Sequence, residues 1–360
     1  MDIERVYVLS KVKQQIDELR ANGETVWSFS RLGSFHNCEY EYYNTYVKKN
    51  KTKQNCYGAI GGSVHDYIEG IYKGENNIEG FKHAFNQSII EIELLDIDFP
   101  NEVIKNSFIS DVRHFTENFN KLEGKFLLEH QVLFKVGEHW IQGFIDAIHV
   151  TEDKELNIID WKTSSKFTGD KLNDSGRQLL MYKLALESTT KHKINKVMWC
   201  MIKYIYVCHT QKNGKVKRKM VNRGKIIKEM RNAFEKEMLA SGMDSFEIDI
   251  LLDECAKTNT FEKLTPIITD KYWLEDCFVE YEANEEKIQE LITYVNNTID
   301  SINSKDFDNA DDWKPAISEK NSFYCNTLCG HRHTCSFRKE FIEKNNHKKK
   351  NTDNVFNLFY

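Results

Sequence analysis

The chain has 360 residues, a formal charge of −5 at pH 7 and 40% hydrophobic residues, so it can bury a sizeable core and is not basic over its whole surface. Only 3 prolines and 17 glycines argue against a fibrous or linker-rich chain, and the longest apolar stretch, 197–208, is interrupted by Lys203 and is too short to span a bilayer. The first residues mix acids and bases where an export signal needs an apolar run, so we expect a cytoplasmic protein with no membrane segment.

Positive charge is nevertheless gathered in short runs, at 48–53, 191–196, 212–219 and 347–350. Each run is either an ordinary solvated loop or part of a stripe that contacts nucleic acid. With this overall charge, any track for nucleic acid is expected to be such a stripe.

Hydrophobic periodicity predicts four helices in the first part of the chain, at 2–21, 60–73, 76–94 and 101–121. The period then becomes extended and predicts three consecutive antiparallel strands, at 126–136, 139–150 and 156–163. Next come a helix at 177–187, a buried strand at 194–207, a hairpin through Asn213-Gly214, and helices at about 223–242 and 282–303. The unit of helix, three strands, helix and strand predicts an α/β fold, a mixed sheet with helices on its faces.

Two neighbouring strands carry a carboxylate in cross-strand register. If 151–155 forms the loop, Val150 pairs with Leu156, and counting back places Asp146 opposite Asp160. Directly opposed side chains have Cβ atoms about 4.5–5.5 Å apart, where like charges repel. A positive group is therefore expected between the two acids.

Lys162 lies next to this pair. Because side chains alternate along a strand, Lys162 projects from the same face as Asp160, and Trp161 projects from the other. One interpretation is a structural salt bridge. The other is a hard divalent cation held by both carboxylates and a backbone carbonyl, for which we take that of Trp161. Such an ion lowers the pKa of a bound water, and Lys162 can orient or deprotonate that water or stabilise a phosphoryl group, which describes a phosphodiester-cleaving site.

Three more polar residues stand near this unit. His65 shares the apolar stripe of the 60–73 helix and is expected to face inward, either as a satisfied core residue or as a ligand. Gln178 and Tyr182 stand four positions apart on the 177–187 helix, so both present polar tips on one side.

These pieces, in this order, resemble the RecB-type branch of the PD-(D/E)XK nuclease superfamily. GGSVHDYIEG matches the histidine of its first helix, GFIDAI the G-x-x-D of its second strand, IIDWKTS the D-x-K of its third and RQLLMY the Q-x-x-x-Y of its next helix. The resemblance implies a restriction-endonuclease-like core, DNA as substrate and Mg or Mn as cofactor. It also implies roles: His65, Asp146 and Asp160 bind the metal, Lys162 serves the nucleophilic water, and Gln178 and Tyr182 contact the substrate strand or brace the site. Glu129 lies where several relatives carry an acid.

A second resemblance involves cysteines at both ends of the chain. SFSRLGSFHNCEYEYYNTY, at 28–46, resembles the S-x-S-R-L…C-P-x-x-Y segment of RecB- and AddB-like nucleases, with Glu39 in place of the usual proline. YCNTLCGHRHTC near the C terminus completes a pattern similar to the 4Fe-4S clasp of AddB-type and CRISPR-associated RecB-like exonucleases, although three residues rather than two separate its first pair. The implied ligands are Cys38, Cys325, Cys329 and Cys335.

Two alternatives to the iron-sulfur cluster stay open. One is a structural Zn²⁺, for which His331 or His333 can replace a thiolate. The other is four unrelated cysteines. We expect an N-terminal arm at 1–59 with the first of these cysteines, a nuclease core at 60–222 with a helical insertion at 76–121, a mainly helical region at 223–320, and a C-terminal segment at 321–360 with the other cysteines and a basic tail.

The sequence therefore predicts a metal-dependent DNA nuclease, an exonuclease acting on single strands or duplex ends in recombination, repair or phage DNA metabolism. No Gly-Lys pair is followed by Ser or Thr, so we find no Walker A loop, and we expect any helicase or recombination partner to be another chain. The alternative is a non-catalytic DNA-binding or scaffold protein that retains the fold with a structural zinc or iron-sulfur site.

Overall fold

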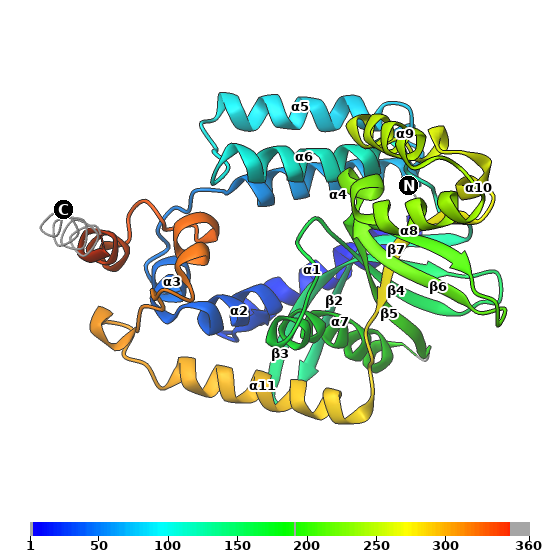
Figure 1. The fold of residues 1–360 in the computed structure, drawn as a ribbon. Helices are drawn as coiled ribbons and strands as arrows, with labels where there is room; N and C mark the ends of the chain where they lie inside the picture. The colour runs from blue at the N-terminus through cyan, green and yellow to red at the C-terminus, as the bar shows by residue number, and fades with distance from the viewer. Residues whose placement is uncertain (1–2, 191, 346–360) are drawn as a thin grey trace, which may run out of the picture.

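A mixed sheet forms the centre of the molecule. The computed structural model describes residues 3–190 and 192–345, and within them seven strands form one sheet with helices against both faces (Figure 1). The α/β architecture predicted from the sequence is confirmed. Of the basic runs, Lys191 and the tail at 347–350 lie outside the described residues.

The strands are β1 (Val26–Ser28), β2 (Lys125–Val136), β3 (His139–Val150), β4 (Leu156–Lys162), β5 (Ile194–Thr210), β6 (Val216–Asn222) and β7 (Tyr272–Glu280). Their order is β1-β3-β4-β5-β6, with β2 also paired to β3 and β7 to β5. β1 runs parallel to β3, and β4 runs parallel to β5. The remaining pairs are antiparallel.

The three consecutive antiparallel strands lie where the sequence predicts them. Val150 pairs with Leu156, as expected, and the same register continues to the pair of Ala147 with Ile159. β1 and β7 were not predicted. β1 has only 3 residues, too few for a period to show. β7 interrupts the region expected to be mainly helical, and its buried positions do not alternate regularly along the strand.

Helices cover both faces of the sheet (Figure 1). One face carries α4 (Cys56–Lys73), α5 (Phe81–Leu94) and α6 (Glu102–Glu117), and the other carries α2 (Phe29–Asn37), α7 (Asp170–Thr189) and α11 (Glu285–Asn303). The remaining helices are α1 (Ile3–Ala21), α3 (Glu39–Tyr42), α8 (Ile226–Ala240), α9 (Ser245–Thr258) and α10 (Pro266–Thr269). Within the described ranges, no helix is long and apolar enough to cross a membrane.

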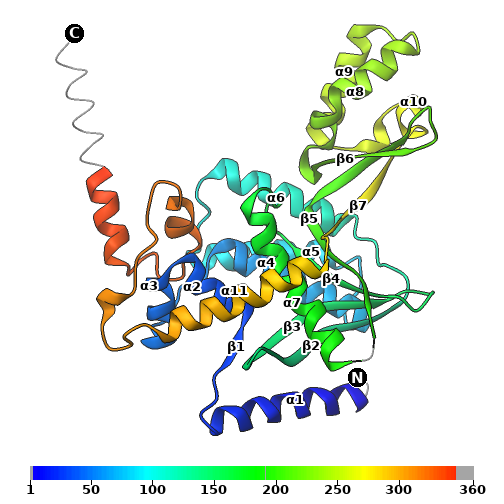
Figure 2. The same cartoon turned by 90° about the horizontal axis from the view of Figure 1, so that it is seen from below.

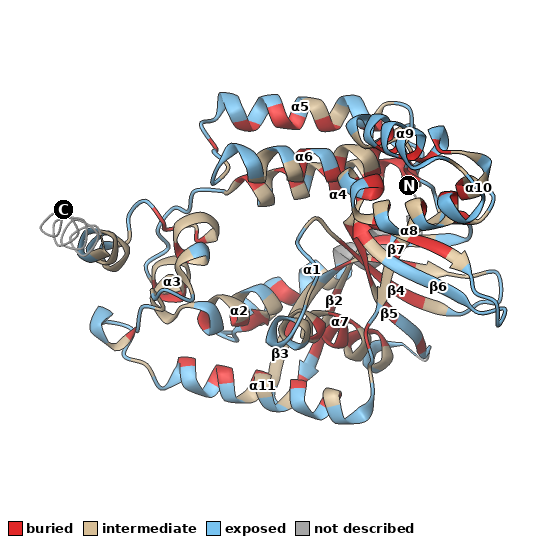
Figure 3. Cartoon of the chain, in the orientation of Figure 1, coloured by how far each residue is buried: buried red, intermediate tan, exposed pale blue. Residues whose placement is uncertain are grey.

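Side-chain alternation along β4 divides the core in two. Ile158 faces the cluster built with α7 and α11, whereas Ile159 and Trp161 face the cluster built with α4, α5 and α6. The buried positions lie along the sheet and on the helix sides turned toward it (Figure 3). Neighbouring residues of β4 therefore pack into clusters on opposite faces of the sheet. One face of the strand can carry polar side chains while the other face stays apolar.

The long strand β5 carries a third core at its far end. Ile205 and Val207 pack there with α8, α9 and α10, whereas Trp199 and Met201, nearer the start of the strand, belong to the α7 side. Figure 2 shows α8, α9 and α10 gathered at the end of the β5, β6 and β7 ribbon, away from α11. The helices of region 223–320 therefore serve two different cores, because α11 returns to pack beside α7.

A buried arginine joins the third core to the sheet and to α6. Arg223 is 1% exposed, forms an ion pair with Asp276 of β7 and donates from Nε to the Tyr204 carbonyl at 2.9 Å. Its guanidinium also lies 5.0 Å from the ring centroid of Phe115 in α6. The guanidinium of Arg223 thus contacts β5, β7 and α6 at the same time.

Arg223→Met is expected to lower the free energy of unfolding by about 3–5 kcal/mol, because it leaves the carboxylate of Asp276 with little water and no counter-ion. The control is Arg218→Met. Arg218 pairs with the neighbouring Glu275, but its side chain is 50% exposed, so a loss below about 1 kcal/mol is expected. Urea denaturation measures both, and equal losses would contradict the role given to Arg223.

Candidate active site

The predicted acids lie where β3 and β4 separate. The ladder between these strands ends at Ala147 and Ile159, while β4 stays paired with β5 through Lys162. Just beyond that point, the Trp161 N–H donates to Oδ2 of Asp146 at 3.1 Å. The Asp146 carboxylate thus takes the place of a β3 backbone carbonyl as the acceptor for this N–H. The hydrogen bond holds the Asp146 side chain against β4.

α4 brings His65 to the same carboxylate. His65 Nδ1 lies 3.4 Å from Oδ2 of Asp146, and its ring stands edge-on to Trp161 with a centroid separation of 6.3 Å. The helix approaches β4 closely at Gly61, where an added Cβ would lie 3.1 Å from Oγ1 of Thr163. His65 therefore faces the sheet, as the apolar stripe predicts.

Asp160 is the most deeply buried acid of the site. It is 1% exposed, and its Oδ2 lies 2.7 Å from Nζ of Lys162, which projects from the same face of β4. Neither carboxylate oxygen makes a well-directed hydrogen bond to any described residue. A carboxylate removed from water in this way requires a cation, and Lys162 is its counter-ion.

Lys162 is itself held by α7. Its Nζ donates to Oε1 of Gln178 at 3.1 Å, and Nε2 of Gln178 donates to the Tyr182 hydroxyl at 2.8 Å. The Tyr182 ring packs directly on β3 at Gly143, where an added Cβ would lie 3.3 Å from its Cε1 atom. The glycine of the G-x-x-D motif thus makes room for the tyrosine of the Q-x-x-x-Y motif.

Glu129 lies across from Asp146 on the neighbouring strand. Leu128 pairs with Ala147 and His130 pairs with Ile145, so Glu129, between them, lies opposite Asp146. The Glu129 backbone has a φ of 45°, a left-handed conformation that is uncommon outside glycine. The strand is therefore locally distorted beside the site.

The pKa values follow from this burial and crowding. Burial, and then the charge of Asp160, raise the pKa of Asp146 well above its usual value, and Glu129 adds to the shift. Burial opposes the charged form of Lys162, but Asp160 and Asp146 outweigh it and raise its pKa. Burial lowers the pKa of His65. Without a metal, the site therefore has a protonated lysine and a neutral imidazole at neutral pH, and neutral imidazole is the form that binds metals.

The family model of the PD-(D/E)XK nuclease superfamily matches residues 26–336. The chain belongs to the PD-(D/E)XK nuclease superfamily. No curated protein matches it significantly. Among solved structures it is similar to one titled "Crystal structure of SSO0001", at 17% identity and a TM-score of 0.18, over 50% of this chain and 70% of the other. A TM-score this low supports no argument about fold or function.

Nucleases of this superfamily generally use Mg²⁺ or Mn²⁺, and the donor types here suit such an ion. The buried Asp160 carboxylate has no well-directed hydrogen bond from the described residues, and its charge acts on Asp146 and His65. Asp146 in turn contacts His65 and the Trp161 N–H. In the described part of the nuclease, however, no three His, Cys, Asp or Glu side chains are arranged closely enough to hold a metal together. In the structure, the cation next to Asp160 is Lys162.

The predicted cluster cysteines gather around one cavity. Cys38 from the N-terminal part and Cys325, Cys329 and Cys335 from the C-terminal part all line it, together with His331. Burial raises the pKa of Cys325 to about 11 and also raises the pKa of Cys38 and Cys329. These thiols are therefore protonated unless a metal stabilises their anions. As at the acidic site, the described side chains are not arranged as metal ligands.

The two histidines considered as zinc ligands, His331 and His333, differ in their position relative to the cysteine cavity. His331 lines the cysteine cavity, but its Nε2 is 2.9 Å from Oγ1 of Thr45, so this ring nitrogen already has a partner. His333 is exposed and does not line that cavity.

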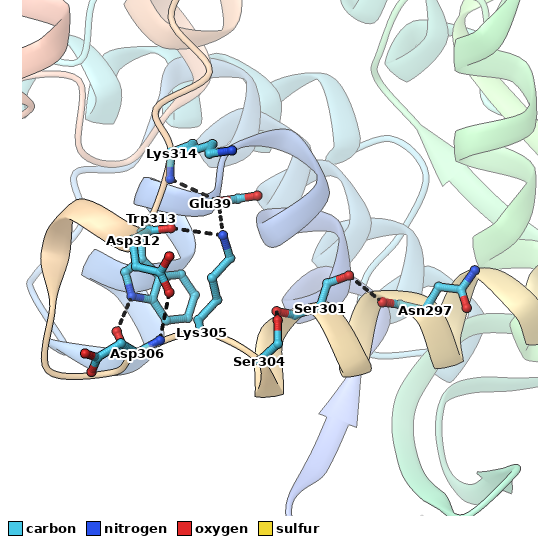
Figure 4. Close-up of polar contacts among 9 residues, drawn as sticks. All are labelled: Glu39, Asn297, Ser301, Ser304, Lys305, Asp306, Asp312, Trp313 and Lys314. Carbon is cyan, nitrogen blue, oxygen red and sulfur yellow. Dashed lines mark hydrogen bonds and ion pairs between the residues drawn. The ribbon is translucent and has the colours of Figure 1, made fainter.

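The two ends of the nuclease are also joined by polar contacts that involve no cysteine. Lys305, just after α11, donates from Nζ to Oε2 of Glu39 at 2.7 Å and to the Asp312 carbonyl at 2.9 Å, and Lys314 donates its backbone N–H to the same Glu39 oxygen at 3.0 Å (Figure 4). Arg332 donates to the backbone carbonyls of Lys53 and Gln54, each at 2.8 Å. Glu39 thus anchors the C-terminal segment.

Asp146→Asn tests the electrostatics of the acidic pair. The pKa of Asp146 is higher in the folded protein than in the unfolded chain, so the folded protein keeps a proton that the unfolded chain has released. The contribution of Asp146 to the free energy of unfolding therefore falls as pH rises from near 3.8 through the folded pKa. In EDTA, the asparagine variant is expected to gain stability relative to the parent as pH rises from about 5 to about 8, measured by urea denaturation.

Asp153→Asn is the matched control, because Asp153 is an exposed acid in the turn between the same two strands. Its stability difference from the parent is expected to stay nearly constant over this range. A pH-independent difference for Asp146→Asn would contradict the electrostatics assigned to the pair.

Proposed function

We propose that the protein is a Mg²⁺- or Mn²⁺-dependent DNA nuclease, an exonuclease that hydrolyses phosphodiester bonds of single strands or duplex ends. The observation that carries the proposal is the buried carboxylate of Asp160, which lacks well-directed hydrogen bonds to the described residues, pairs with the Lys162 ammonium and acts electrostatically on Asp146 and His65. A carboxylate in this state suits a cation site better than a purely structural core.

In this proposal, His65, Asp146, Asp160 and the carbonyl of Trp161 hold the metal. The bound ion supplies a water of lowered pKa and offsets negative charge on the phosphoryl group. Asp146 is positioned for this role by the Trp161 N–H and by its contact with His65.

Lys162 acts as a cation rather than as a base. Its raised pKa keeps it protonated, so it stabilises charge that develops on the phosphoryl oxygens. Gln178 orients the ammonium through a 3.1 Å hydrogen bond, and Tyr182 orients Gln178. In this proposal both residues also contact the substrate strand, and support comes from their position in the wall of a cavity of about 360 Å³.

The finer assignment rests on the order and identity of the motifs, which resemble the RecB-type branch. We take residues 60–222 as the nuclease core and expect recombination, repair or phage DNA metabolism as its setting, in the cytoplasm. We propose a separate helicase or recombination protein as a partner, because the sequence contains no Walker A loop of its own.

Asp160→Ala and Lys162→Ala are each expected to reduce cleavage of labelled DNA with Mg²⁺ or Mn²⁺ by at least about 100-fold, because each removes a group that acts on the reacting phosphate. DNA binding is expected to survive. The measurements are product formation on end-labelled single- and double-stranded DNA and fluorescence anisotropy of the same DNA.

Asp153→Ala and Lys196→Ala are the controls, since both change exposed charges near the same strands and are expected to cut at the parent rate. EDTA is expected to stop the parent enzyme. Cleavage by Asp160→Ala at the parent rate would remove the site assignment, and a parent protein inactive with every DNA and both metals would favour a non-catalytic DNA-binding or scaffold role.

We further propose that Cys38, Cys325, Cys329 and Cys335 bind a 4Fe-4S cluster that clasps the two ends of the chain. Support comes from their gathering around one cavity and from their thiol chemistry. A structural Zn²⁺ is the alternative occupant. The contacts of Glu39 and Arg332 join the same two segments, so the clasp adds to an existing connection.

Protein purified without oxygen is expected to be brown, with broad absorption near roughly 400 nm. Cys325→Ser is expected to lose this absorption, whereas Cys255→Ser, at an isolated buried cysteine of the third core, is expected to keep it. A colourless protein that contains stoichiometric zinc would show that these cysteines bind Zn²⁺ instead of an iron-sulfur cluster. A colourless protein without any metal would contradict both assignments.

A further inference from the structure

The basic run at 212–219 forms a turn and the first part of an edge strand. It joins β5 to β6, and every residue from 211 to 219 is exposed. The run contains four lysines, one arginine and no acidic residue. β6 pairs only with β5, so its other edge has no strand partner within the described part of the chain (Figure 1). Positive charge therefore gathers on an open edge of the sheet.

Most of this charge is not neutralised by the rest of the protein. Arg218 forms an ion pair with Glu275 of β7, and Nζ of Lys219 donates to the Glu229 carbonyl at 2.7 Å. The other three lysines of the run, here called the arm lysines, form no ion pair with any described residue: Lys212, Lys215 and Lys217. Their ammonium groups are free to bind an anion from solution.

The edge that carries the arm lysines continues from the acidic site. β7 pairs with both halves of β5, so β4 and β6 share the opposite edge of that strand, one after the other. Lys162, at the end of β4, pairs with Met201, and Asn222, at the end of β6, pairs with Tyr204. The acidic site at the end of β4 thus borders the same edge of the sheet as β6.

The rise of β5 limits the distance between the acidic site and the arm lysines. Met201 lies opposite Lys162, and Thr210, nine residues further along β5, pairs with Val216 at the start of β6. At about 3.3 Å per residue, these two positions on β5 are at most about 30 Å apart. Successive base pairs of duplex DNA rise by about 3.4 Å, so the span corresponds to at most about 9 base pairs.

We infer that the arm lysines bind the phosphate backbone of a DNA duplex whose end lies at the acidic site. The inference rests on the proposed function, which places the cleaved phosphate beside Asp160 and Lys162. A cluster of lysines without acidic partners attracts phosphates and releases their counter-ions, whereas a chain with a net charge of −5 needs such a local cluster to attract DNA. The contact positions the duplex and reads no sequence, because it involves phosphates alone.

Lysine on an open strand edge also prevents two sheets from pairing edge to edge. That role accounts for Lys217, which lies within β6. Lys212 and Lys215 precede β6, in the turn, where they do not cover its edge. Protection of the edge therefore leaves two of the three arm lysines unexplained.

The test uses a DNA stem of about 20 base pairs with one open end and a short loop at the other, bound in EDTA, where no cleavage occurs. The arm variant carries Lys212→Gln, Lys215→Gln and Lys217→Gln. It is expected to bind at least about 10-fold more weakly than the parent at about 50 mM salt. The slope of log affinity against log salt concentration is expected to become shallower by about 2–3, because each lost phosphate contact removes about 0.9. Fluorescence anisotropy measures both quantities.

The matched control makes the same change in net charge at three exposed lysines of the neighbouring helical region: Lys236→Gln, Lys257→Gln and Lys263→Gln. It is expected to change the affinity by less than about 3-fold, because charges that lie away from the DNA are screened by salt. Both triple variants are expected to keep the parent melting temperature, since the changed side chains are exposed.

A second measurement applies to the parent itself. Neutral methylphosphonate linkages replace three successive phosphates in each strand of the stem, and this neutral window is moved along the duplex. The parent is expected to bind more weakly when the window lies about 6–9 base pairs from the open end. The arm variant is expected to be insensitive to the same window, because the contact that the window removes is already absent.

An arm variant with the affinity and salt slope of the parent would overturn the inference, and so would a parent that tolerates every neutral window. Self-association of the arm variant at unchanged DNA affinity would also overturn it and would assign the lysines to protection of the edge.

The nuclease proposal has its own outcome. If the parent cleaves DNA with Mn²⁺ and the arm variant binds as tightly as the parent, the nuclease stands and the arm contact is removed. If duplex binding depends on the arm lysines in a protein that never cleaves, the arm contact stands as a DNA-binding site and the nuclease is removed.

Discussion

The buried carboxylate of Asp160 constrains everything around it. A charge that is 1% exposed and has no well-directed hydrogen bond to the described residues is stable only beside a cation. Lys162 meets this need because it lies two residues further along the same strand face, 2.7 Å away. The lysine is held in turn by Gln178 of α7, so this hydrogen bond links the ion pair to the helix that covers it.

The sheet is built to bring donors from both of its faces to this point. β4 remains paired with β5 while it separates from β3, which frees the Trp161 N–H for Asp146 and lets α4 bring His65 to the same carboxylate. α7 approaches from the opposite face with Gln178. Most of the site therefore rests on strands and long helices, which hold side chains more rigidly than loops do.

Those parts of the site that follow from local rules were predictable from the sequence. Loop length fixes the hairpin register, and alternation places Asp160 and Lys162 on one face and Trp161 on the other. β7 was missed because its buried positions do not alternate, and the cavity that Gln178 and Tyr182 line was missed because residues far apart in the chain build it. The division of region 223–320 between two cores likewise depends on long-range packing, which no local pattern records.

The most direct test of the central claim is a Mn²⁺ titration followed by electron paramagnetic resonance, with the parent and an Asp160→Asn variant. If this buried acid is a metal ligand, the parent removes the signal of free Mn²⁺ and the variant binds at least about 10-fold more weakly. Equal affinity in the two proteins would contradict the account, because Asp160 would then be buried only as the structural partner of Lys162.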